Sequence, residues 1–98
     1  MKLLTKALIK KLPQVGFGAN NTREDLVFHV KLFHPSSNWT WYISEYDEKT
    51  GECFGLVDGF EQELGYFSLP ELQSVRVHGL GIERDLYFSS TKYPDLKL

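Results

Sequence analysis

The chain has a single cysteine, Cys53, and no long apolar run. One cysteine excludes an intramolecular disulfide, and a reducing, cytoplasmic setting is the simplest expectation. No stretch approaches the ~20 apolar residues that a membrane-spanning helix needs. The opening residues 1–13 make a poor signal peptide, because Lys6, Lys10 and Lys11 interrupt any apolar core. The sequence therefore predicts a cytoplasmic protein that does not enter a membrane.

Strong basic charge and the usual signatures of chemistry are also absent. The formal net charge is −2 at pH 7, whereas a general polyanion binder needs a basic face. The histidines His29, His34 and His78 do not fall at metal-ligand spacing, and Cys53 has no cysteine nearby, so a zinc site is not expected. No serine lies in a nucleophile-elbow motif. We therefore predict no metal, no cofactor and no catalytic residue; the alternative is a small hydrolase that uses His34 or a carboxylate pair.

What the chain does have is a concentration of aromatic and acidic residues between positions 38 and 67. Residues 39–45 alternate in the manner of a strand, with Trp39, Trp41 and Ile43 on one side. Turn-forming residues follow at 47–51, and they end in a glycine that can adopt positive φ. The pattern predicts a β-hairpin whose tryptophan face lies in the core.

The register of this hairpin can be predicted from the apolar pattern. Pairing Ile43 with Phe54 gathers the large apolar groups on one face, whereas pairing Ile43 with Gly55 splits them. We predict the first register. It places Glu45 opposite Glu52, which is mildly unfavourable, and a bulge at the closing glycine of the turn would relieve the repulsion.

The remaining elements follow from periodicity and capping signals. Hairpin connections imply a mostly antiparallel sheet of four to five strands with helices at one face or end, so the predicted fold class is α+β. We expect a single domain over residues 1–98, with a loosely held tail from about residue 90. The expected elements are a helix at 5–12, a loop at 14–25, strands at 26–34, 39–45, 52–58, 66–68 and 84–89, and a capped helix near 69–76.

Charge is distributed unevenly along the chain. Residues 45–71 hold eight acids and one lysine, whereas Lys2, Lys6, Lys10 and Lys11 precede the first acid. Such asymmetry suits electrostatic docking to a charged partner. It also suits a solvated surface that keeps a small domain soluble, and the sequence leaves both interpretations open.

The leading functional hypothesis is a non-enzymatic protein that binds another protein through its acidic and aromatic surface. Alternation turns Tyr42 and Tyr46 away from the tryptophan face, so they are the expected surface rings. With Glu61 and Glu63 they form the predicted binding site.

The alternative hypothesis is nucleic-acid binding. Lys6, Lys10 and Lys11 would supply the basic contacts of a lysine-rich helix, and tyrosine or tryptophan rings would stack on bases.

Four stretches of the sequence resemble a known family. They are MKLLTKALIKKLP, FHPSSNWTWYISEYD, FGLVDGFEQELGYFSLPEL and IERDLYF, and together they are similar to domain of unknown function 2958, a family of short bacterial proteins. The resemblance implies a single-domain cytoplasmic protein of the kind often carried on plasmids, phages and integrative elements. It implies no activity and no catalytic residues, and it places the expected variation in the loops at 14–25 and 77–83.

Overall fold

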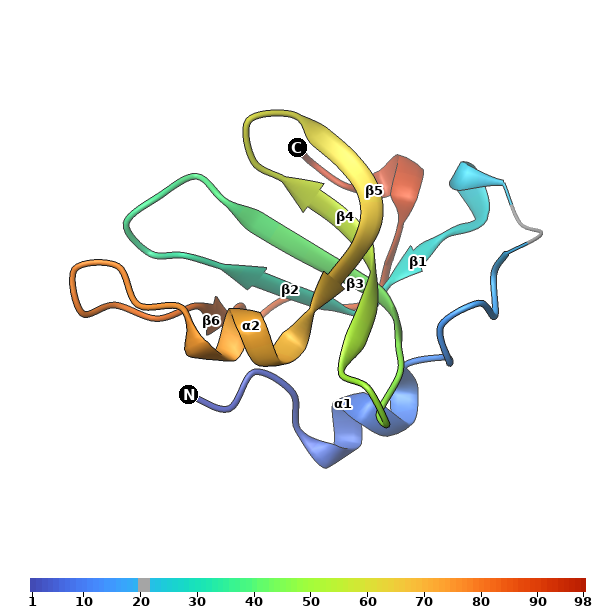
Figure 1. The fold of residues 1–98 in the computed structure, drawn as a ribbon. Helices are drawn as coiled ribbons and strands as arrows, with labels where there is room; N and C mark the ends of the chain where they lie inside the picture. Colours follow the sequence, from blue (N-terminus) through green and yellow to red (C-terminus); the bar gives the residue numbers. More distant parts are fainter. Residues whose placement is uncertain (20–21) are drawn as a thin grey trace.

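The computed structural model describes residues 1–19 and 22–98, so the predicted loop at 14–25 is described except for positions 20 and 21. Short helices flank a series of short strands (Figure 1). The elements in chain order are α1 (Lys6–Lys11), η1 (Arg23–Asp25), β1 (Val27–Phe28), β2 (Val30–Phe33), β3 (Thr40–Tyr46), β4 (Glu52–Asp58), β5 (Gln62–Ser68), α2 (Leu69–Ser74), β6 (Glu83–Arg84), β7 (Thr91–Lys92) and η2 (Tyr93–Asp95).

Five strands form one antiparallel sheet in the order β5-β4-β3-β2-β6, and β1 pairs with β7 in a separate ribbon. The predicted α+β class, with an antiparallel sheet and an N-terminal helix, is confirmed. Within the described residues, no helix has the length and hydropathy to cross a membrane.

Both faces of the sheet are covered. Figure 1 shows α1 and α2 on one side, while β1 and the C-terminal segment lie on the other. Each side has its own apolar cluster, and a fully buried side chain such as Phe28 contributes about 1.5–3 kcal/mol. The helix-side core comprises Leu3, Leu4, Leu12, Val30, Leu32, Ile43, Cys53, Leu72 and Ile82, and the far-side core comprises Leu26, Phe28, Tyr42 and Leu56.

The two helices begin where the local signals predict. The Thr5 hydroxyl accepts the Leu8 N–H (3.2 Å), and the Ser68 hydroxyl accepts the Glu71 N–H (3.3 Å). These side chains satisfy amide donors that have no partner within the helix. The second helix ends at Ser74, two residues before the predicted end at position 76.

The predicted register of the central hairpin is wrong. Ile43 pairs with Gly55, and the irregularity lies at Ser44, between Ile43 and Glu45, and not in the turn. The reason is a close approach of two backbones: a Cβ atom on residue 55 would collide with the carbonyl oxygen of Tyr42. Only glycine fits there, so the backbone contact decides the register against the apolar pattern.

This bulge places Tyr42 and Tyr46 on opposite faces of the sheet. Tyr42 pairs with Leu56 in the far-side core and is 5% exposed, so its prediction as a surface ring is wrong. Tyr46 pairs with Cys53 and packs, half-buried, against the helix-side core. The predicted interior position holds for Ile43, which is fully buried.

The strand predicted over residues 26–34 is interrupted at His29. Its N–H donates to the Ile43 carbonyl (2.9 Å), and the chain then passes from one core to the other. Phe28 lies in the far-side core and Val30 in the helix-side core, although strict alternation predicts that they share a face. The break lies opposite the bulge of β3, so both strands change face at the same level of the sheet.

Two later strands also differ from prediction. β5 begins at Gln62 and not at Tyr66, because the β4–β5 connection shortens to a tight turn. The strand predicted at 84–89 is reduced to the two residues of β6.

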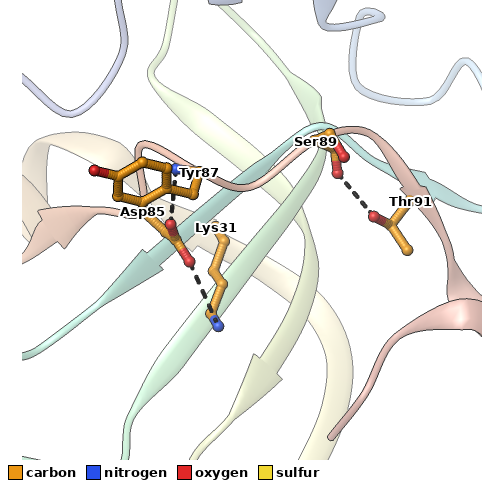
Figure 2. Close-up of polar contacts among 5 residues, drawn as sticks. All are labelled: Lys31, Asp85, Tyr87, Ser89 and Thr91. Atoms are coloured by element: carbon orange, nitrogen blue, oxygen red, sulfur yellow. Dashed lines mark hydrogen bonds and ion pairs between the residues drawn. The ribbon is translucent and has the colours of Figure 1, made fainter.

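The C-terminal segment packs against the far-side core through Tyr93 and Leu96. Figure 2 shows how the chain before it is held: Asp85 approaches Lys31 (3.8 Å) and accepts the Tyr87 N–H (2.9 Å), and Thr91 donates to the Ser89 carbonyl (2.7 Å).

Candidate functional site

The β4–β5 hairpin forms a free edge of the sheet. Within residues 1–19 and 22–98, β4 is the only strand paired with β5, over all seven residues of Gln62–Ser68. The opposite edge strand, β6, has only two residues. A seven-residue edge leaves a row of backbone groups available to another chain.

Acidic side chains lie at both ends of this edge. At the turn end are Glu61 and Glu63, which the sequence predicted as site residues, and both are exposed. At the other end, Asp47, Glu52 and Glu71 line a concave region of about 500 Å³ together with Thr50, Tyr66, Phe67 and Ser68. The hairpin therefore presents negative charge along its length.

Exposed rings accompany these acids. Phe60 in the turn is 94% exposed, and it packs edge-on against Trp39 with ring centroids 5.3 Å apart. Tyr66 on β5 is 63% exposed and lies 5.1 Å from the Phe54 ring. The sequence predicted aromatic anchors here but assigned them to Tyr42 and Tyr46. Phe60 and Tyr66 were missed because their exposure depends on how far β5 extends.

A second concave region, of about 280 Å³, lies between the β2–β3 turn and the loop after α2. Trp39 and Trp41 form one wall, with ring centroids 6.0 Å apart, and both indoles are half-buried. His34 and Ser36 also line it, so the histidine of the hydrolase hypothesis lies beside a cleft.

The local bonding of His34 is that of a turn residue. Its Nδ1 accepts the Ser36 N–H (3.2 Å) and lies 3.0 Å from the Ser36 hydroxyl. Its Nε2 donates to the Leu80 carbonyl (3.1 Å), because a carbonyl oxygen can only accept. The ring is buried, and its two nitrogens connect the β2–β3 turn to the loop after α2.

Glu45 is a buried carboxylate that sequence reasoning had placed in the exposed acidic segment. Its two oxygens accept the N–H groups of Gly16 (2.8 Å) and Gly18 (2.9 Å). It thereby anchors the loop after α1 to the bulged part of β3, beside a cavity of about 290 Å³ that Arg23 and Tyr66 also line. No sequence signal identifies this role, because it depends on the bulge.

The remaining reactive groups lie apart from one another. Burial, followed by the charge of Glu52, raises the pKa of Cys53 to about 12, so its thiol is protonated at neutral pH and is a poor nucleophile. Among the described residues, no three His, Cys, Asp or Glu side chains gather in a group that could hold a metal ion. Lys6, Lys10 and Lys11 are all exposed on α1.

Together these features define a small α+β protein whose antiparallel sheet is covered on both faces and open at an acidic edge. A family profile described as a protein of unknown function (DUF2958) matches residues 3–94, and the chain belongs to that family. No curated protein and no solved structure matches the chain.

Proposed function

We propose that this chain is a non-enzymatic accessory protein that binds a basic segment of another protein through the β4–β5 hairpin. The observation that carries the proposal is that exposed acids lie at both ends of a free strand edge, and that Phe60 and Tyr66 are exposed on the same hairpin. Charge speeds the encounter, while apolar rings that become buried slow dissociation.

The proposal revises the site predicted from sequence. Glu61 and Glu63 remain in it, Phe60 and Tyr66 replace the buried Tyr42 ring, and Tyr46 contributes at most a partial surface. The biological setting that we propose is the cytoplasm and a bacterial mobile element, and the mobile-element setting rests on the family resemblance alone.

Reversing the charge of Glu61 and Glu63 to lysine tests this function. The partner is first captured from a bacterial lysate at low salt, identified by mass spectrometry and purified. We expect the double variant to associate with it about tenfold more slowly or worse, because steering by charge acts on the association rate. Surface plasmon resonance at several salt concentrations measures the rate.

The matched control reverses two exposed acids outside the hairpin, Glu24 and Asp95. It changes the net charge by the same amount and is expected to leave most of the association rate intact. A partner that binds both double variants as fast as the natural chain would exclude the β4–β5 hairpin as the contact surface.

The alternative function is nucleic-acid binding through α1, favoured by the exposure of Lys6, Lys10 and Lys11 on one short helix. It predicts a complex with DNA or RNA at low salt. Neutralising Lys10 and Lys11 to glutamine would then reduce the slope of log affinity against log salt by about 2 for duplex DNA. Gel-shift titrations with single- and double-stranded probes measure it, and no shift at low salt would exclude this alternative.

A further inference from the structure

We infer that the partner segment binds as an added antiparallel or parallel strand on the free edge of β5. This inference deepens the function proposed above and rests on it. The binding mode is backbone pairing. The partner is an extended segment in which basic and apolar residues alternate. The structure supports it through the hydrogen-bond pattern of the hairpin, the two faces of β5 and the charge around it.

The hydrogen-bond pattern shows which backbone groups of β5 face outward. At the turn end, the Gly59 N–H donates to the Glu61 carbonyl (3.1 Å), and at the other end the Leu69 N–H donates to the Gly51 carbonyl (2.8 Å). Both pairs continue the register of the β4–β5 ladder. Hydrogen-bonded and non-hydrogen-bonded pairs alternate along antiparallel strands. Odd-numbered residues of β5 therefore bond to β4.

The even-numbered residues of β5 consequently direct their N–H and C=O groups away from the sheet. Before Ser68, where the strand leads into α2, these residues are Gln62, Leu64 and Tyr66, and no other described backbone group bonds to them. They give three donors and three acceptors at the spacing of a strand. Because one strand residue spans ~3.3 Å, the whole edge fits a partner segment of about seven residues.

The side chains of β5 set the pattern that such a segment needs. Leu64 pairs with Leu56 and Tyr66 with Phe54, so these side chains lie on the far-side face beside the 290 Å³ cavity. Glu63 lies on the opposite face. An added strand would thus place every second side chain against apolar groups and the others toward a carboxylate.

A basic occupant fits this edge better than a second copy of the chain. Residues 45–71 carry eight acids and one lysine. Pairing two copies through β5 would bring both acidic hairpins together, and like charges facing one another across strands are destabilising. A segment with alternating lysines or arginines would instead neutralise the acids at both ends of the edge.

The test uses the full chain and a fluorescent eight-residue peptide that alternates lysine and valine. Its affinity is measured by anisotropy for the natural chain and for two variants, Tyr66→Ala and Tyr66→Pro. Both variants lose the ring, but only proline also removes the outward N–H. Proline is tolerated at an edge position whose N–H does not bond within the sheet. We expect proline to weaken binding about fivefold more than alanine, the effect of one lost hydrogen bond.

A measurement without mutation accompanies it, since proline can also disturb the strand. Peptide binding should slow amide hydrogen exchange at Leu64 and Tyr66 of the natural chain. Equal affinities for the alanine and proline variants, with unchanged exchange, would overturn strand addition, while the charge-reversal experiment would still decide the proposed function. Two results would contradict a basic segment as the occupant of the β5 edge. One is that the peptide does not bind the natural chain; the other is that the chain forms concentration-dependent dimers that the peptide does not dissociate.

Discussion

Replacing Gly55 by alanine is expected to lower the free energy of unfolding by about 3 kcal/mol or more, at or above the upper end of the usual cost of overpacking. The added methyl group would collide with the Tyr42 carbonyl, which is backbone and cannot rotate away. β3 and β4 would have to separate at the bulge, and the pairing of Ile43 with residue 55 would be lost. Urea denaturation followed by tryptophan fluorescence measures the change.

Gly65 provides a matched control because it pairs with Gly55 on the neighbouring strand. A Cβ atom at position 65 meets no atom within 4 Å, so alanine there is expected to change stability by less than about 1 kcal/mol. Similar losses from both substitutions would contradict the close approach as the reason for the register.

The second large effect is expected at Glu45. Replacing it by alanine removes both acceptors of the Gly16 and Gly18 amides, and hydrogen bonds to a charged group contribute about 1.5–3 kcal/mol each. We expect a loss of about 2–3 kcal/mol, because water can reach part of the freed loop and compensate. The loop should also become cleavable by protease under conditions in which the natural chain resists.

Glu48→Ala is the control, because Glu48 is an exposed acid of the neighbouring turn. Its loss should change stability by no more than about 0.5 kcal/mol, as for most surface substitutions. A Glu45 variant as stable and as protease-resistant as this control would show that the carboxylate does not hold the loop.

The parts of the fold that sequence predicted correctly are those with local causes. Ser68 caps α2 through a hydroxyl three residues from the amide that it bonds. Gly51 closes the β3–β4 turn with a φ of 78°, which the turn chemistry required. Each of these features depends on a few neighbouring residues, so a single stretch of sequence contains the necessary information.

The errors have non-local causes. The bulge at Ser44 and the break at His29 lie on different strands, and each is compatible with the other only in the assembled sheet. Alternation correctly put Tyr42 on the face opposite Ile43, but that face carries the far-side core and is not the protein surface. Alternation also assumes a regular strand, so it placed Phe28 and Val30 on one face although the break at His29 separates them. The collision that determines the register involves a glycine and a backbone oxygen thirteen residues away, and neither leaves a trace in the apolar pattern.

The candidate site was predicted in part for the same reasons. The acids at Glu61 and Glu63 follow from composition, because charged side chains in a turn and on an edge strand remain in water. The free edge itself could not be predicted, since the order of strands depends on the position of β6 and on the length of β5. Exposure of Phe60 and Tyr66 follows from that edge.

Ser44 is, in effect, a one-residue insertion that the sheet has absorbed. It has no cross-strand partner in β4, and the residues before and after it alternate as though it were missing: Ile43 faces the helices, Glu45 the far side and Tyr46 the helices again. A shorter relative lacking this one position would keep every later side chain of β3 in phase. Loss of a second residue from the same strand would instead exchange inside for outside along the rest of it.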